Sequence, residues 1–103
     1  MVTNRIYEDS AYIGDFGYPI TLDTEINITS ADEVKIIVIK PDEDSTEDSW
    51  IGSVVDDTKV QHFLEDGELD IKGTYLLHAF AKKAASWQRM GTLFKLNVLK
   101  KGE

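Results

Sequence analysis

The residues best suited to metal chemistry form an acidic run that begins at Asp42. Calcium takes oxygen ligands from such loops, and Asp42, Asp44 and Thr46 have the spacing of the first three ligands of a calcium-binding loop. The pattern then departs, because the sixth position holds Glu47 in place of glycine and the twelfth holds Ser53 in place of glutamate. A solvated, charged hairpin loop is the alternative, and the sequence leaves open whether the run binds calcium.

The two histidines, His62 and His78, are the candidates for acid–base or ligand chemistry near neutral pH. Both lie within strand-like patterns, without a second ligand at metal-site spacing and without a serine–histidine–aspartate order. The glycines are dispersed and form no phosphate-binding loop. The chain has no cysteine, which excludes a disulfide and a thiolate metal site. We therefore predict no catalytic residues, no enzymatic activity, no cofactor and, apart from the acidic run, no metal site.

The two tryptophans, Trp50 and Trp87, are candidates for an aromatic platform that stacks against sugar rings. Such a platform requires both rings to be exposed on one face, and a position near a hairpin tip favours exposure of Trp87. Partial burial is the alternative, because a tryptophan at the start of a strand commonly packs in a sandwich core. A carbohydrate-binding adhesion module is therefore the alternative function, with a glycan as its partner.

The elements that would position these side chains are strands, because apolar and polar residues alternate with a period of two. The segment 34–40 is rich in β-branched residues and apolar on both faces, as in a central strand partly covered on both sides. We predict an all-β, immunoglobulin-like antiparallel β-sandwich of about seven strands. The strands cover residues 11–13, 18–23, 34–40, 50–55, 58–64, 74–82 and 92–99, and Trp87 begins the return to the last.

The run from Leu69 to Ala81 is a turn that leads into the longest alternating strand. Gly73 lets the chain bend, and the hydroxyl of Tyr75 can bond a backbone group a few residues upstream, as at the corner of a β-sandwich. Immunoglobulin domains carry a cysteine two residues after this tyrosine, where this chain has Leu77. A hydrophobic contact would therefore replace a disulfide at this place in the core.

The two faces of this long strand differ in character. The core face carries the more uniformly packable set, which is Tyr75, Leu77, Ala79 and Ala81. On the opposite face, Leu76 and Phe80 are large and apolar with His78 between them, which indicates a covered surface. An oligomer contact or docking into a larger assembly could cover these three residues, and so could a loop or the N-terminal segment.

The length and charge of the chain are those of a small acidic domain, with 103 residues and a net charge of −8. This length fits one domain, 1–103, with residues 1–9 as a flexible N-terminal arm. The acidic surface repels nucleic acid and anionic membranes, and it either serves solubility or receives a basic partner. No apolar run approaches the ~20 residues of a membrane span, and the N-terminus lacks a signal-peptide pattern. We expect a protein made in a cytoplasm and kept there or released by lysis.

A series of short motifs runs through most of the chain, from about Tyr12 to Val98. They are YIGDFG from residue 12, Ile20, TSA from residue 29 before the strand at 34–39, KPD from residue 40, WIGSV from residue 50 and GELD from residue 67, followed by Gly73, Tyr75, Leu77, Ala79, Trp87, Gly91 and FKLNV from residue 94. In order and spacing they resemble a group of small virion domains of tailed bacteriophages. These domains are immunoglobulin-like sandwiches, similar to the N-terminal domain of baseplate upper proteins.

Two loops depart from the pattern of this group. Members usually place a glycine directly after KPD, whereas here Glu43 begins a longer acidic loop, 42–48, and Thr92 stands where members usually carry glutamate. The resemblance implies a non-enzymatic structural component of a tailed-phage particle, in the tail, baseplate, neck or capsid surface. It implies no cofactor. The implied partners are other virion proteins and further copies of the chain, and the implied location is the virion after assembly in the host cytoplasm.

Overall fold

The computed structural model describes residues 7–103, which form nine strands in two sheets and no helix. The strands are β1 (Tyr7–Tyr12), β2 (Pro19–Asp23), β3 (Glu33–Ile39), β4 (Glu47–Ile51), β5 (Ser53–Val55), β6 (Lys59–Phe63), β7 (Gly73–Lys83), β8 (Trp87–Met90) and β9 (Phe94–Leu99). Within these residues no helix could span a membrane.

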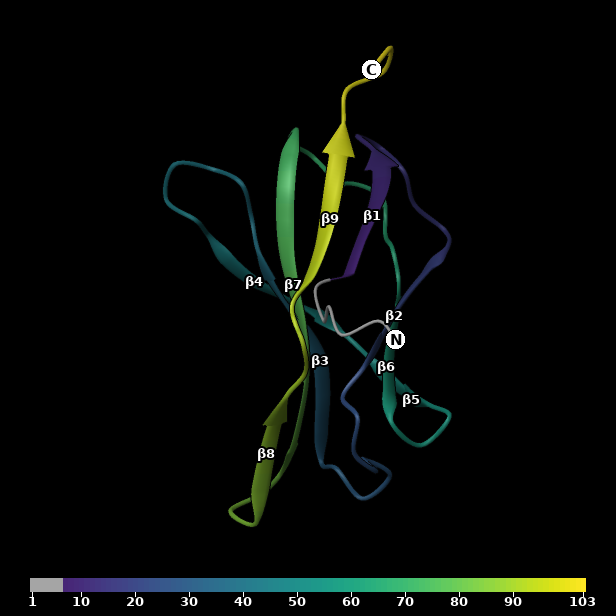
Figure 1. Ribbon diagram of the computed structural model, residues 1–103, viewed down its shortest axis with the longest axis vertical. Coiled ribbons are helices and arrows are strands. Elements are labelled where there is room, and N and C mark those ends of the chain that lie inside the picture. The colour runs from purple at the N-terminus through teal and green to yellow at the C-terminus, as the bar shows by residue number, and fades with distance from the viewer. Residues whose placement is uncertain (1–6) are drawn as a thin grey trace, which may run out of the picture.

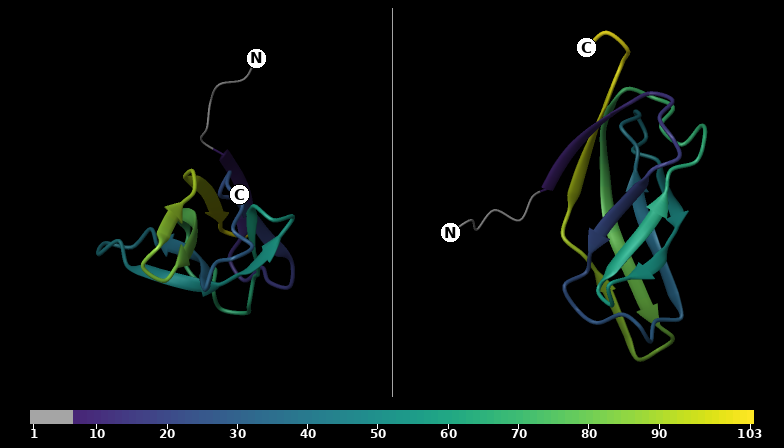
Figure 2. Two further views of the ribbon diagram at one scale, coloured as in Figure 1. Left: turned by 90° about the horizontal axis from the view of Figure 1, so that it is seen from below. Right: turned by 90° about the vertical axis from the view of Figure 1, so that its right-hand side faces the viewer.

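The strands, which are labelled in Figure 1, form two sheets. The larger sheet has the order β1-β9-β7-β3-β4 with β8 also paired to β7, and the smaller sheet has the order β2-β6-β5. Figure 2 shows the smaller sheet lying over one face of the larger. The prediction of an all-β sandwich is confirmed, with nine strands in place of about seven. The difference arises because the segment 50–55 is divided and the return that begins at Trp87 forms a separate strand, β8.

The larger sheet is mixed, which corrects the prediction of a wholly antiparallel sandwich. β1 runs parallel to β9, and its residues 7–9 pair with residues 94–96. Of the predicted flexible arm, 1–9, residues 7–9 begin this edge strand, while residues 1–6 lie outside the described part of the chain. Ladder hydrogen bonds join backbone groups, so a polar segment can form this edge strand without an apolar pattern. Almost the whole chain separates β1 from β9, so no hairpin imposes an antiparallel direction on them.

Gly52 divides the segment that was predicted as one strand between the two sheets. β4 pairs with β3 in the larger sheet, and β5 pairs with β6 in the smaller one. A Cβ atom at Gly52 would lie 2.4 Å from Cγ1 of Val60 and 3.4 Å from Cα of Lys35. Glycine is required where the backbone approaches its neighbours this closely. The crossing at Gly52 joins the two sheets along one side of the sandwich.

The core lies between the sheets and confirms the predicted inner face of β7. The four predicted residues are all 0% exposed: Tyr75, Leu77, Ala79 and Ala81. They pack with buried residues from the neighbouring strands, among them Ile36, Val38, Val60, Leu96 and Val98. The opposite face of β7 is therefore turned away from the smaller sheet.

The corner between β6 and β7 is held by Tyr75, whose ring is fully buried. Its hydroxyl lies 3.2 Å from both the backbone nitrogen and the backbone oxygen of Ile71, and this confirms the predicted bond to an upstream backbone group. Gly73 has a φ of 133°, and a Cβ atom there would lie 2.7 Å from Cβ of Pro41. The chain that leaves β3 therefore packs directly on this corner.

Candidate functional site

The candidate interface residues Leu76, His78 and Phe80 all point outward from β7, on the side away from the core. Leu76 and His78 are half-buried, while Phe80 is 8% exposed. Phe80 is covered by Lys35 of β3, whose Nζ lies 5.1 Å from the centroid of the ring. An ammonium group at this distance is attracted to the aromatic face, and its alkyl stem also shields the ring.

The strand register places more apolar side chains beside these three residues. On β3, Ile39 is opposite Leu76 and Ile37 is opposite His78, and both isoleucines are half-buried. At the two edges, Ile51 of β4 and Met90 of β8 are 87% and 47% exposed. We use the term outer face for the outward side of β3, β4, β7, β8 and β9, which comprises Glu33, Lys35, Ile37, Ile39, Glu47, Ser49, Ile51, Leu76, His78, Phe80, Lys82, Met90 and Lys95.

The sequence did not identify the contributions of β3, β4 and β8 to the outer face. The β3 residues could have been identified from the sequence, because the segment 34–40 is apolar on both sides. One side faces the core, and Ile37 and Ile39 lie on the other. Ile51 and Met90 carried no such signal, because their strands are short and largely polar. Only strand pairing shows that they lie in line with Phe80.

The two histidines are bonded to other groups of the protein. Nδ1 of His78 lies 2.8 Å from the carbonyl oxygen of Gly91, to which it donates. His62 is 6% exposed, with Nδ1 2.7 Å from the Ile51 carbonyl oxygen and Nε2 2.8 Å from the Glu68 carboxylate. These contacts hold elements together, and neither histidine is joined to a nucleophile by a hydrogen bond within residues 7–103.

The two tryptophans do not share an exposed platform. Trp50 is 3% exposed, and its ring stacks on that of His62 with centroids 5.1 Å apart and an interplanar angle of 25°. Its side chain is therefore closed to a sugar. Trp87 is half-buried and packs against the core at the start of β8. The condition for the predicted platform, exposure of both rings, is not met at Trp50.

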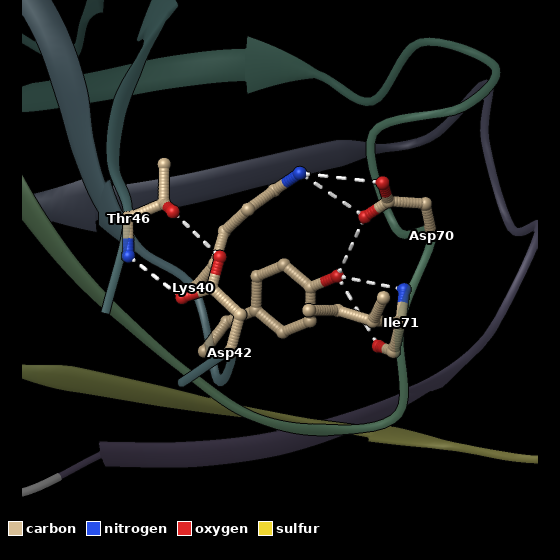
Figure 3. Close-up of polar contacts among 6 residues, drawn as sticks. Lys40, Asp42, Thr46, Asp70 and Ile71 are labelled. Carbon is tan, nitrogen blue, oxygen red and sulfur yellow. Dashed lines mark hydrogen bonds and ion pairs between the residues drawn. The ribbon is translucent and has the colours of Figure 1, made fainter. Parts of the chain in front are cut away.

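The acidic segment 42–48 was predicted as a loop, but its last two residues belong to β4, so the loop ends at Thr46. This loop is organised by one of its own carboxylates (Figure 3). Asp42 accepts hydrogen bonds from the hydroxyl of Thr46 at 2.6 Å and from its backbone nitrogen at 2.8 Å. These bonds favour the charged form and lower the pKa of Asp42 below its ordinary value. Across residues 7–103, no cluster of three or more acidic or histidine side chains is arranged to hold a metal ion.

Two cavities of modest size lie beside the strands, and only the second touches the outer face, at its edge residue Ile51. One, of about 290 Å³, opens between β2 and β9 beside Leu22 and Phe94. The other, of about 280 Å³, lies beside Gly52 and includes His62 in its lining. Ligand pockets for small molecules usually begin near 300 Å³ and combine enclosure with a few convergent polar groups. Since both ring nitrogens of His62 are already bonded, the outer face is the stronger candidate site.

The chain was also compared with known proteins. It matches no protein-family model, no curated protein and no solved structure.

Proposed function

We propose that this chain is an immunoglobulin-like, non-enzymatic structural component of a tailed-phage particle that acts through protein–protein assembly. The position in the particle is the tail or baseplate, the neck or the capsid surface. The partners are other virion proteins and further copies of the chain, and the outer face is the surface proposed for this assembly. The assignment to a phage particle rests on the resemblance carried by residues 12–98.

The strand order supports the immunoglobulin-like part of the proposal. Variable-type immunoglobulin domains extend their G-F-C sheet by a further strand, and the order β9-β7-β3-β4 corresponds to that arrangement. The order β2-β6-β5 corresponds to strands B, E and D of the facing sheet. The Tyr75 hydroxyl bonds back to Ile71, and Leu77 is fully buried where immunoglobulin domains carry their second cysteine.

The observation that carries the assembly function is the outer face itself. It gathers apolar side chains from four strands, and its edge residue Ile51 is 87% exposed. A contiguous apolar surface on a small domain generally marks a protein-binding site. Many copies on a symmetric particle would act together, so each contact needs to bury only a modest area.

The carbohydrate-binding alternative would need both tryptophan rings exposed on one face, and the structure does not place them so. Trp50 is buried against His62, and Trp87 packs on the core.

The proposal is tested on particles from a phage or prophage that encodes the chain. Particles purified to constant density are expected to contain the protein in multiple copies by quantitative mass spectrometry. The variant Ile51→Asp is expected to remain folded but to be lost from the particles, because it places a charge within the apolar surface. Phe16→Asp is the matched control, since Phe16 is 58% exposed in the loop after β1. Absence of the native protein from purified particles would contradict the proposal.

A further inference from the structure

We propose that the outer face binds a second copy of the chain, in a two-fold dimer whose axis runs parallel to the strands between β3 and β7. The inference rests on the proposed role of the outer face in assembly, and it names the partner of that face. The strand register arranges the side chains of the outer face in four rows that run across the strands, and each row pairs favourably with itself under this axis.

The first row begins and ends with opposite charges. Across the sheet it reads Glu47, Ile39, Leu76 and Lys95, from β4 to β9. A two-fold axis along the strands exchanges the two ends of a row. Glu47 therefore meets Lys95 of the second copy, and Ile39 meets Leu76 of the second copy. Because a two-fold contact is made twice, this row alone supplies two ion pairs and two apolar contacts.

The third row has exposed apolar side chains at both ends. It reads Ile51, Lys35, Phe80 and Met90, from β4 to β8. The same axis places Ile51 against Met90 of the second copy, which would cover the two most exposed apolar groups of the face. It also brings the Lys35–Phe80 pair of one copy, which is already in cation–aromatic contact, against the same pair of the second copy.

The remaining rows agree with the same axis. In the second row, Ile37 meets His78 of the second copy. In the fourth row, Glu33 is opposite Lys82, so the axis again brings unlike charges together.

A two-fold axis perpendicular to the strands would give a poorer match. This axis would place each strand against the same strand of the second copy and would exchange the first row with the third. The charged Glu47 would then lie against the apolar Ile51 of the second copy. The same axis would also place Lys95 toward Met90 of the second copy. Both arrangements remove water from a charge without supplying a partner. The row pattern therefore selects the axis parallel to the strands.

The size of the face suits a weak, specific dimer. Four strands spaced about 4.8 Å apart and about seven residues long cover a flat footprint of about 440 Å² per copy. Two copies would bury about 900 Å² when the faces are treated as flat, without the additional area of protruding side chains. This value is near the lower limit of about 1,000 Å² for specific interfaces. Twisted sheets that pack face to face align at about −30°, which is compatible with this axis. The dimer is therefore expected to be reversible and to depend on protein concentration.

The decisive experiment is a charge exchange in the full chain, followed by sedimentation velocity over a wide concentration range. Glu47→Lys and Lys95→Glu are each expected to weaken the dimer about tenfold, because each creates two like-charge contacts. The double variant is expected to restore the dimer. The two single variants change the net charge in opposite directions, so a general charge effect would move their dimer affinities oppositely. Glu43→Lys, in the loop off the sheet, is the matched control and should leave the affinity unchanged.

A disulfide test examines the axis directly, since the chain has no cysteine of its own. Ile51→Cys and Met90→Cys proteins, mixed under oxidising conditions, are expected to link to each other much faster than either links to itself. Preferential self-linking of Ile51→Cys, or a monomer at all concentrations, would overturn the dimer. A monomer that still occurs in purified particles would overturn the dimer alone. A dimer that is absent from particles would overturn only the proposed phage function.

Discussion

Asp70 connects two side chains at the corner before β7. Its carboxylate lies 3.1 Å from Nζ of Lys40 and 3.2 Å from the hydroxyl of Tyr75 (Figure 3). Burial alone would raise the pKa of Asp70, but the hydrogen bond and charge of Lys40, with smaller contributions from its own backbone amide and Tyr75, hold it below its ordinary value. The hydrogen bond to Asp70 in turn raises the pKa of Lys40. Burial and the neighbouring Asp70 raise the pKa of Tyr75.

The first residue-scale prediction concerns the hydroxyl of Tyr75. Tyr75→Phe is expected to lower the free energy of unfolding by about 1–2 kcal/mol, because it leaves polar groups of Ile71 without their buried partner. Urea denaturation of both proteins measures the difference. Tyr12→Phe is the matched control, since the Tyr12 hydroxyl donates to the Glu103 carbonyl oxygen at an exposed place. Equal losses for the two variants would contradict a special role of the corner.

The second residue-scale prediction is a pH dependence of the Lys40–Asp70 pair. A lowered pKa at Asp70 stabilises the fold above the ordinary carboxyl range near 4, and this contribution is lost as the pH falls through the lowered value. The raised pKa of Lys40 stabilises the fold below about 10.5, and its contribution is lost at higher pH. Asp70→Asn is therefore expected to destabilise most between about pH 5 and 9, by less than about 1 kcal/mol because Asp70 is half exposed.

Urea denaturation at several pH values tests this dependence. The difference between wild type and Asp70→Asn should shrink as the pH is lowered below about 4. Asp66→Asn, at an exposed position of the preceding turn, serves as the control. A difference that stays constant down to pH 2 would show that the variant acts through packing instead of charge.

At the scale of elements, the passage from β4 to β5 is the most constrained connection. The Cγ1 atom of Val60 occupies the place of a Cβ at position 52, and Val60 is 0% exposed. A valine side chain is stiff about its first torsion and cannot turn away cheaply. The crossing between sheets therefore depends on glycine.

Gly52→Ala is expected to lower the free energy of unfolding by about 1–3 kcal/mol, the usual cost of overpacking a core. The double variant Gly52→Ala/Val60→Ala should lose less than the two single losses together, because the second change removes the clash. Thermal and urea denaturation of the four proteins measure this coupling. Ser53→Ala, at an exposed neighbouring position, is the control. Simple additivity would argue against the contact with Val60.

The strands differ in how well their sequences predicted them. β3 and β7 carry apolar residues at every second position, and β6 alternates buried Val60 and His62 with more exposed residues, so their positions followed from the pattern. β1 and most of β4 are polar because they lie at the edges of the larger sheet. Their backbone pairing stabilises them, and backbone groups leave no signature in the residue types. The acidic start of β4 was therefore assigned to a loop.

At the scale of the whole molecule, the outer face differs in its balance of charge from the chain as a whole. The chain carries a net charge of −8, yet the outer face includes Lys35 and Lys95 beside its apolar centre. Like charges over the rest of the surface discourage unspecific association, whereas the proposed two-fold dimer would pair unlike charges across the outer face. This distribution would favour one mode of self-association over others.

The sequence by itself determined the all-β class, the inner face of β7 and the corner at Tyr75. Each of these depends on residues close together in the chain, where the period of two and the turn residues act locally. Tertiary structure alone decided the parallel pairing of β1, the crossing at Gly52 and the burial of Trp50. It also assembled the outer face, because its rows join residues from β4, β3, β7, β8 and β9. The apolar pattern fixes which face of a strand turns inward, but the distant strand that pairs with it is decided only when the shared core closes.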